Sequence, residues 1–412
     1  MSSDWISTTL GEFAPFKYGK GLPERVRVPG EVPVFSSAGH IGSHSTPLVE
    51  GAGIIIGRKG TVGSVYYAAS SFWPIDTTFF VTDEPSQRDL RYTYYLLTTL
   101  GLDKLNTDSA VPGLNRENAH SRPIKVPSFN EQIAIANTLQ ALDDRITLLR
   151  ETNKTLEAIA QAIFKSWFVD FDPVKAKMDG RQPAGMDEET AALFPDELVE
   201  SDLGLIPKGW EVKSIADICS TVTNGGTPSR SRADFWQAGS VPWYKTGEFA
   251  DSFLLESSEY ITETAVAESS VKLLPENSVL MAIYAAPTVG RLGVLTRPSA
   301  FNQACTGMVA KKDIGTWFLY WTLYFARTWF NSHANGAAQQ NISKAIVSDY
   351  QLACPSNDVL LAFQGLSNPL HEKIRSNAEK AGALAQLRDT LLPRLISGKL
   401  RVPIDEVEPS EV

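Results

Sequence analysis

The stretch LDDRITLLRETNKTLEAIAQAIFKSW, from Leu142 to Trp167, interrupts a chain that is otherwise rich in glycine, proline and short apolar runs. Its apolar positions recur at alternating intervals of three and four residues, the pattern of a helix that packs along one face against a second helix. The stretch therefore predicts one helix of a coiled coil. The positions on the packing face, the seam, are Leu142, Ile146, Leu149, Asn153, Leu156 and Ile163.

A second seam follows 228 residues later and supplies a partner helix. The chain order favours antiparallel packing, because the first helix leads towards the segment from which the second begins. Asn153 and Asn377 fall on the seams, where a buried amide typically fixes register; half-exposed asparagines beside a frayed contact are the alternative. Arg388 and Pro393 weaken the last two turns of the second helix. The second seam consists of Leu370, Ile374, Asn377, Leu384 and Leu391.

The globular segment that precedes each helix is also repeated. Trp5 corresponds to Trp210 at an offset of 205 residues, and Leu114 corresponds to Ile342 at an offset of 228. Within the first copy, GIIIGRKGTVGSVYYAA predicts two strands joined by a glycine-rich turn, and DLRYTYYLLTTLGLDKL predicts a helix. The aromatic run from Trp317 to Phe330 has helical spacing and predicts a core helix rather than a stacking surface.

These repeats predict a mixed α/β fold with a pseudo-two-fold internal repeat. Two similar α/β domains are separated by two long helices that form an antiparallel coiled coil. The expected layout is domain 1–130, helix 131–168, acidic linker 169–208, domain 209–358, helix 359–400 and acidic tail 401–412.

The formal net charge of −9 does not argue against a nucleic-acid partner. Residues 170–208 carry −6 and the tail carries −4, so the rest of the chain is close to neutral. No apolar run is long enough to span a membrane, and the N-terminus does not resemble a secretory signal. Three widely spaced cysteines indicate free buried thiols. We therefore expect a cytoplasmic protein.

The usual sequence motifs of catalysis are absent. The chain has no P-loop, no GxGxxG and no [DNS]PP[YF] tetrapeptide of amino-methyltransferases. His40 and His44 lie in a loop-like composition, so a shared metal site is not expected. The pair Asp196 and Glu211 has the PD…ExK spacing of metal-dependent nucleases, which leaves a fused nuclease as one alternative. Asp196, however, lies in the acidic linker. We expect a non-catalytic chain.

Several segments, taken in order, resemble the specificity subunit of type I restriction-modification systems. They are GWEVKSIADICSTVTNGGTPS, FNQACTGMV, NEQIAIANTLQALDDRI, FKSWFVDFDPVKAKMDG and LRDTLLPRLISGKL. The resemblance implies two target-recognition domains, each of which reads one half of a bipartite site on double-stranded DNA. It also implies that the two helices set the gap between the half-sites. A coiled-coil adaptor that never reads DNA is the second alternative.

The same resemblance implies partners that carry the chemistry. Two modification subunits would dock on the helices, hold S-adenosylmethionine and methylate adenine, and restriction subunits that use ATP and Mg²⁺ can join them. The chain itself would hold no cofactor and no metal.

Base edges and phosphates are contacted by arginine, lysine, asparagine and glutamine, mostly from loops. Aromatic residues beside them are further candidates. The repeat places such residues after Gly21 and Gly226, around Ser36 and Lys245, and near Leu114 and Ile342. The predicted DNA-binding residues are Lys17, Tyr18, Lys20, Arg58, Lys59, Asn115, Arg116, Arg230, Arg232, Tyr244, Lys245, Arg291, Gln339, Gln340 and Asn341.

Overall fold

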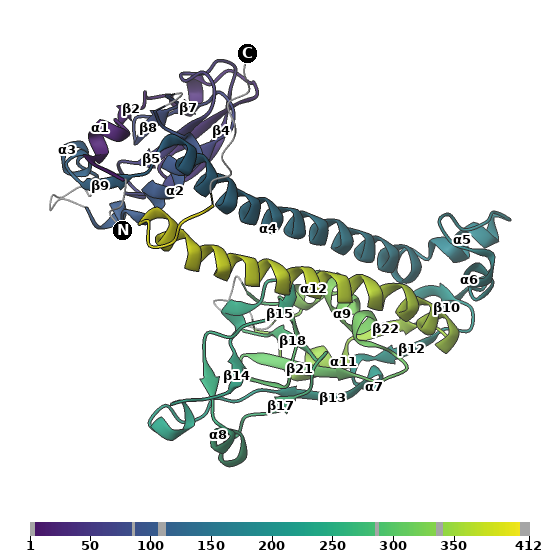
Figure 1. Cartoon of the computed structure of the whole chain (residues 1–412). Helices are drawn as coiled ribbons and strands as arrows, with labels where there is room; N and C mark the ends of the chain where they lie inside the picture. The colour runs from purple at the N-terminus through teal and green to yellow at the C-terminus, as the bar shows by residue number, and fades with distance from the viewer. Residues whose placement is uncertain (1–4, 85–86, 106–112, 285–287, 335–340, 404–412) are drawn as a thin grey trace. The chain divides into compact units, whose positions relative to one another are not determined.

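The computed structural model describes residues 5–84, 87–105, 113–284, 288–334 and 341–403 (Figure 1). The chain divides into a first unit, residues 1–149 with 380–412, and a second unit, residues 150–379. The boundary falls inside both long helices, α4 (Phe129–Phe164) and α12 (Asn357–Ile396). Each unit therefore combines one globular domain with one segment of each long helix.

The first unit is built on a sheet of strand order β2-β8-β5-β6. Its central strand β5 carries Ile54, Ile55 and Ile56, all fully buried, because side chains on both faces of the sheet are covered. A smaller sheet has the order β4-β3-β7, and β1 pairs with β9. The strands are β1 (Ile6–Thr9), β2 (Lys17–Tyr18), β3 (Val32–Ser36), β4 (Gly39–His44), β5 (Gly53–Gly57), β6 (Val65–Ala68), β7 (Trp73–Pro74), β8 (Thr78–Thr82) and β9 (Pro123–Val126).

The second unit repeats this plan with the sheet order β13-β21-β18-β19-β15. A second sheet has the order β16-β14-β20-β17, and β12 pairs with β22. The strands are β12 (Glu211–Ser214), β13 (Cys219–Asn224), β14 (Val241–Tyr244), β15 (Ser252–Leu254), β16 (Tyr260–Ile261), β17 (Leu273–Leu274), β18 (Val279–Ala282), β19 (Leu292–Leu295), β20 (Ser299–Phe301), β21 (Cys305–Ala310) and β22 (Gln351–Cys354).

The hydrogen-bond register confirms the internal repeat residue by residue. Ile6 lies opposite Val126 in the β1–β9 pair, and Glu211 lies opposite Cys354 in the β12–β22 pair. These pairs are related by the offsets of 205 and 228 residues seen in the sequence. Each domain is thus closed by its own first and last strands, and a long helix follows directly after the last one.

Short helices begin at matching capping residues in the two units. The Thr9 and Ser214 side chains cap α1 and α7, and each forms a capping box with the acidic residue three positions later. The other helices of the domains are α2 (Leu90–Thr99) and α3 (Arg116–His120) in the first unit, and α8 (Glu263–Glu268), α9 (Thr316–Phe325), α10 (Arg327–Ser332) and α11 (Lys344–Asp349) in the second; α1 spans Leu10–Phe13 and α7 spans Ile215–Ile218.

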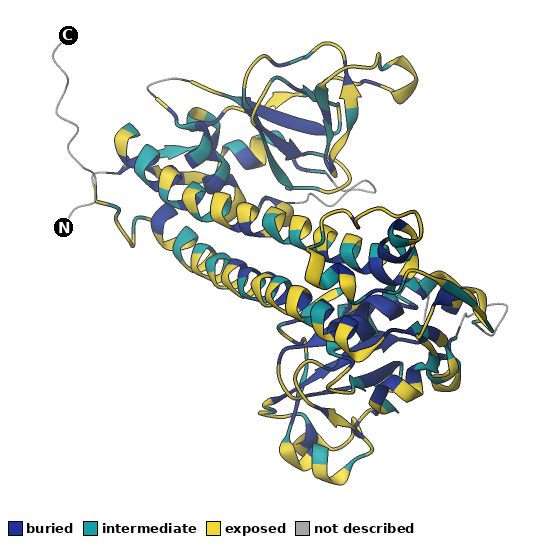
Figure 2. Ribbon diagram, turned by 90° about the vertical axis from the view of Figure 1, so that its right-hand side faces the viewer, coloured by how far each residue is buried: buried dark blue, intermediate teal, exposed yellow. Residues whose placement is uncertain are grey.

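In the first unit, α4 and α12 pack antiparallel through a small apolar cluster. Ile146 and Leu149 of α4 are buried against Ala381 and the partly buried Leu384 of α12. Figure 2 shows the exposed and buried faces of these helices. α12 continues as a helix past Pro393 to Ile396, so its last turns form despite the weakened pattern.

In the second unit, the two seam asparagines meet between the same two helices. Asn377, 1% exposed, donates from Nδ2 to Asn153 Oδ1 at 2.9 Å. Asn153 in turn donates from Nδ2 to the Ile374 carbonyl oxygen at 2.9 Å. The remaining seam side chains are half-buried: Leu156, Ile163 and Leu370 in this unit, and Leu142 and Leu391 in the first unit.

The stretch predicted as an acidic linker is largely folded, which corrects that expectation. It contains α5 (Asp172–Met178), α6 (Glu188–Ala192) and the hairpin of β10 (Leu198–Ser201) and β11 (Gly204–Pro207). Val174, Phe194 and Ile206 enter the main core of the second unit. The net charge of −6 over residues 170–208 suggested a linker, but apolar residues such as Leu193 and Phe194 are present among the acidic ones.

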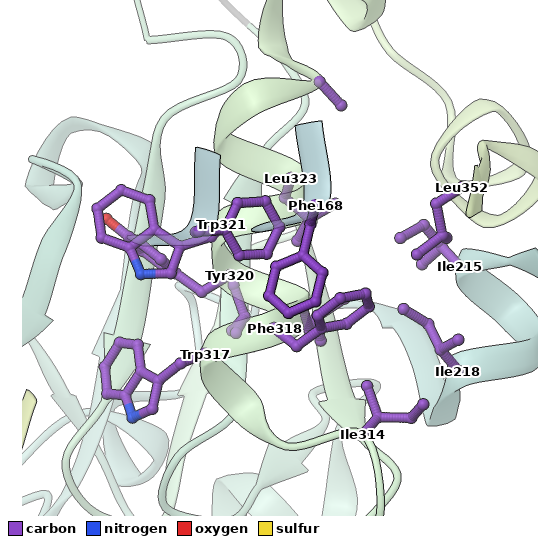
Figure 3. Close-up of a cluster of buried hydrophobic side chains, with 14 of the residues drawn as sticks. Phe168, Ile215, Ile218, Ile314, Trp317, Phe318, Tyr320, Trp321, Leu323 and Leu352 are labelled. Atoms are coloured by element: carbon purple, nitrogen blue, oxygen red, sulfur yellow. The ribbon is translucent and has the colours of Figure 1, made fainter. Parts of the chain in front are cut away.

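The core of the second unit is strongly aromatic (Figure 3). The predicted aromatic helix forms as α9, and Phe318 of α9 packs edge-to-face on Phe168 with ring centroids 5.1 Å apart. Phe168 lies in a π-helical turn, Lys165–Val169, that ends the first long helix. The three cysteines are free and buried, as predicted. Within the described ranges, no helix has the length and apolar character needed to cross a membrane.

Candidate nucleic-acid interface

The glycine-rich turn of the first unit presents Arg58 and Lys59 from a rigid backbone. The Gly63 N–H donates to the Gly57 carbonyl at 2.8 Å, which closes the turn between β5 and β6. Gly63 has φ +74°, and an added Cβ would lie 2.2 Å from the Asp103 nitrogen, so only glycine fits there. The Leu114 N–H donates to the Arg58 carbonyl at 2.8 Å and joins this turn to the segment before α3.

Five of the predicted residues surround one open hollow of about 280 Å³, which we call the first-unit hollow. Arg58 and Arg116 both lie against the Tyr18 ring, with guanidinium carbons 5.0 and 5.1 Å from its centroid. Such cation–π contacts contribute about 0.5–1 kcal/mol each at exposed sites and hold the guanidinium groups in place. The residues of the first-unit hollow are Tyr18, Arg58, Lys59, Phe79, Gly113, Leu114, Asn115, Arg116 and Glu117.

This arrangement has the chemistry of a base- or phosphate-reading surface. Tyr18 is 50% exposed, so its ring is accessible, and the guanidinium groups carry several N–H donors in a plane. The side-chain oxygen of Asn115 is already engaged within the domain. Its Oδ1 caps α3 by accepting a hydrogen bond from the Asn118 N–H at 3.1 Å. Arg116 is paired with Glu117 at 3.0 Å on the surface, a contact that a stronger anion can replace.

The other two candidates of the first unit lie outside this hollow. Lys17 is exposed on β2 and donates from Nζ to Thr82 Oγ1 at 3.1 Å. Lys20 is exposed after the same strand, and its carbonyl accepts from the Trp73 indole at 2.8 Å.

The second unit has two corresponding backbone hydrogen bonds between different residues. The Gly290 N–H donates to the Ala282 carbonyl at 2.8 Å, and the Ile342 N–H donates to the Ile283 carbonyl at 2.9 Å. Ile283 therefore occupies the backbone position that Arg58 holds in the first unit. The two domains share these backbone hydrogen bonds but not the side chains, since Arg58 is half-buried at the hollow whereas Ile283 is fully buried.

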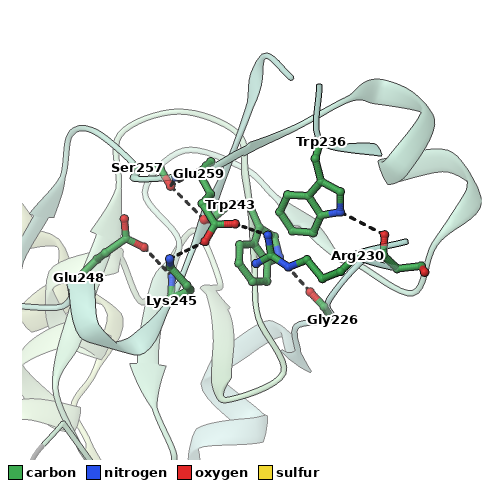
Figure 4. A network of polar contacts seen from close by, with 9 residues as sticks. Gly226, Arg230, Trp236, Trp243, Lys245, Glu248, Ser257 and Glu259 are labelled. Atoms are coloured by element: carbon green, nitrogen blue, oxygen red, sulfur yellow. Dashed lines mark hydrogen bonds and ion pairs between the residues drawn. The ribbon is translucent and has the colours of Figure 1, made fainter. Parts of the chain in front are cut away.

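Two cations of the second unit share one carboxylate (Figure 4). Lys245 Nζ lies 2.5 Å from Glu259 Oε1, and Arg230 pairs with the other oxygen, Oε2. The hydrogen bond from Arg230 is the main cause that lowers the pKa of Glu259. The Arg230 guanidinium also lies 3.6 Å from the Trp236 ring centroid. Lys245 is further fixed by its backbone N–H, which donates to Glu248 Oε2 at 2.7 Å.

The structure describes three of the five remaining polar candidates of the second unit. Arg232 is exposed and paired with Asp234 and Glu268, and the hydrogen bond to Asp234 is the main cause that raises its pKa. Arg291 and Asn341 are half-buried. Gln339 and Gln340 lie outside the described residues.

Tyr244 is wrong as a DNA-contacting candidate. Its side chain is fully buried, and its hydroxyl donates to the Leu254 carbonyl at 3.1 Å inside the domain. Burial also raises the pKa of the phenol. The repeat of VPVF (Val32–Phe35) as VPWY (Val241–Tyr244) pairs Tyr244 with Phe35, a partly buried residue of β3, and this apolar counterpart was a signal that Tyr244 faces inwards.

Glu117 and Glu259 are polar residues that the sequence did not single out. Both lie beside predicted cations, and a carboxylate can accept a hydrogen bond from the cytosine amino group. Glu259 lies 29 residues from Arg230 in the chain, so no local pattern could have joined them.

The proposed nuclease pair does not form a site among the described residues. Glu211 is in the β12–β22 ladder and pairs with Lys213 at 3.0 Å, whereas Asp196 follows α6. In the parts of the chain that the structure describes, no three His, Cys, Asp or Glu side chains converge as metal ligands would.

Comparisons with known proteins agree with this geometry. The type I restriction modification DNA specificity domain matches residues 2–158 and 207–359. The HindI specificity subunit of Haemophilus influenzae is 29% identical over 331 residues, covering 70% of this chain and 71% of its own. The MjaIX specificity subunit of Methanocaldococcus jannaschii is 29% identical over 321 residues, covering 76% and 69%.

The fold also has a solved counterpart. The crystal structure of the type I restriction-modification S subunit from M. genitalium superposes with a TM-score of 0.67 and covers 96% of both chains. At 16% sequence identity this likeness concerns the fold alone.

Proposed function

The chain belongs to the type I restriction modification DNA specificity family, and we propose that it directs such a system to a bipartite DNA site. As a specificity subunit it recognises the sequence and leaves catalysis to other subunits. In this proposal the first domain reads one half-site through the first-unit hollow. The second domain reads the other half-site through the face that carries Arg230 and Lys245.

The repeated backbone with different side chains is the observation that carries this proposal. The matching hydrogen bonds from Leu114 and Ile342 place Arg58 and Ile283 at equivalent points. At this point the first unit carries a cation at the edge of the hollow and the second unit carries a fully buried apolar residue, so one backbone plan bears different side chains, as two domains that read unrelated half-sites require. Neither the nuclease nor the adaptor alternative explains this difference.

The partners follow from the family. We infer that two modification subunits dock on the chain and carry S-adenosylmethionine, and that restriction subunits with ATP and Mg²⁺ complete the cleaving complex. The chain would hold no cofactor of its own and would act in the cytoplasm, where the DNA is.

The test is the pattern of adenine methylation in cells that express the chain with its modification subunit. A methylated motif with two defined halves and a fixed gap is the expected result. If no bipartite motif is enriched, either in the methylome or in duplexes selected by the purified complex, the proposal fails.

The two long helices provide a second test, because we infer that their length sets the gap. A seven-residue insertion keeps the seam in phase, since the seam repeats every seven residues. Matched insertions after Asn153 and before Asn377, which lie at the same level of the antiparallel pair, should lengthen the gap and keep both half-sites. An active complex with an unchanged gap would refute this part of the proposal.

A further inference from the structure

The second unit contains a hollow of about 160 Å³ that DNA reading leaves unexplained. We call it the α9 hollow and define it by six of its lining residues. It lies between α9 and the second-unit segments of α4 and α12. These residues are Glu157, Trp317, Trp321, Tyr324, His371 and Ile374.

Two acceptors on its wall have no partner among the described residues. Glu157 is half-buried without an ion pair or hydrogen bond, and burial raises its pKa. His371 is 3% exposed, and burial lowers its pKa to about 4, so the ring is neutral at pH 7. Its Nδ1 lies 2.8 Å from the Ser367 carbonyl and donates to it, which leaves a lone pair on Nε2. That Nε2 is buried and unpartnered.

The other walls are aromatic. The Trp317 ring stacks on His371 with centroids 3.5 Å apart. Trp321 is 4% exposed, and its indole N–H finds no acceptor among the described residues. Figure 3 shows the Trp317 and Trp321 indoles on the same side of α9, away from Phe318. Aromatic faces and an unpaired carboxylate together favour a cation.

The first unit shows what fills the equivalent place. There, Arg388 of α12 forms an ion pair with Asp143 of α4 at 2.6 Å. The Tyr95 hydroxyl of α2 donates to the same carboxylate at 2.6 Å. In the first unit an arginine of the chain itself therefore lies between α2 and the two long helices, α4 and α12.

In the second unit the position equivalent to Arg388 is not an arginine, and Arg327, which lies over the Tyr324 ring, is paired with the Asp251 carboxylate. α4 and α12 begin at equivalent points after β9 and β22, and α2 and α9 have equal lengths, so the positions can be matched. Ala160 takes the place of Arg388, and its methyl group carries no charge. The matched pairs are Asp143 with His371, Tyr95 with Trp321, and Arg388 with Ala160.

We propose that the α9 hollow binds an arginine side chain of a modification subunit. This inference rests on the proposed function, in which such a subunit docks on the chain. A guanidinium offers planar N–H donors to Glu157 and to His371 Nε2, and it stacks on indole rings. The volume is close to that of a cavity that holds one benzene ring, about 150 Å³, which suits a side-chain head and excludes a nucleotide.

The first experiment measures the dissociation constant of the full chain and the modification subunit encoded with it. Glu157→Gln removes the charge and keeps the shape, and should weaken the complex by about tenfold to a hundredfold, the usual effect of losing a charged hydrogen-bond partner. Gln161→Arg should weaken it similarly, because Gln161 lines the hollow and is half-buried, so its replacement places a guanidinium there from the chain itself. Glu151→Gln, on the exposed face of the same helix, is the control and should have no effect.

The second experiment probes the hollow directly with ethylguanidinium. The indole N–H signal of Trp321 in the intact chain should shift on titration, and the shift should disappear in Glu157→Gln. Complex affinities of Glu157→Gln and Gln161→Arg within twofold of wild type would overturn the proposal, even if ethylguanidinium binds. A bipartite methylated motif alongside that result would show that the DNA-reading function stands and only this inference is wrong.

Discussion

Asn377 and Asn153 are joined across the two long helices by a hydrogen bond of 2.9 Å, and Asn377 is almost completely buried. A polar pair in an apolar seam costs stability but allows only one register, because any shift leaves both amides without partners. The pair therefore fixes how α4 and α12 align within the second unit.

Asn377→Ala should lower the free energy of unfolding by about 1–3 kcal/mol, because the Asn153 oxygen loses its donor in a partly buried place. Ser376→Ala, one residue away and off the seam, is the matched control and should change it by less than about 0.5 kcal/mol. Thermal or urea unfolding measures both. Equal stabilities for the two variants would contradict the role of the pair.

Arg58→Ala should relax or abolish recognition at one half-site and leave the other half unchanged. A base-reading arginine contributes about 1–3 kcal/mol of discrimination, so the methylated motif should become degenerate at one or two positions. The readout is the methylome of cells that carry the variant. Lys125→Ala, an exposed cation of β9 outside the hollow, is the control. Loss of the other half-site would show that Arg58 acts differently.

Tyr244→Phe should leave the DNA target unchanged. The hydroxyl is buried inside the domain, and the Leu254 carbonyl keeps a second donor, Thr296 Oγ1, at 2.8 Å. We expect a loss of about 1 kcal/mol of stability or less. A changed methylated motif in a normally folded variant would show that Tyr244 takes part in DNA recognition.

His371 should make the stability of the second unit depend on pH. Its pKa is about 4 in the folded chain and 6.5 as the ordinary value, so the unfolded chain binds the extra proton between these limits. The part of the free energy of unfolding that depends on a neutral His371 is complete above pH 6.5. It is lost as the pH falls towards 4, and amounts to at most about 3 kcal/mol. His371→Gln should flatten this part of the unfolding profile. Parallel profiles for the variant and the wild type would contradict it.

The repeat made most of the fold predictable, because offsets in the sequence became offsets in the strand register. Ile6 with Val126 and Glu211 with Cys354 are the clearest cases. The first-unit hollow was also largely predictable, since Arg58 and Arg116 lie next to glycine and capping residues that mark loops.

Other features depend on tertiary contacts that no local pattern records. Phe194 is one apolar residue in an acidic stretch, and only the completed core shows that it is buried. Glu259 corresponds in strand register to Gly42, which has no side chain, so its shared contact with Arg230 and Lys245 could not be read from the repeat.

The pairing of β1 with β9, and of β12 with β22, brings the entry and the exit of each domain together at one ladder. A domain whose two ends lie side by side can be exchanged at two points of the chain without a change in the length of α4 or α12. Exchange of one domain can therefore change one half-site of the DNA target while the other half-site stays the same.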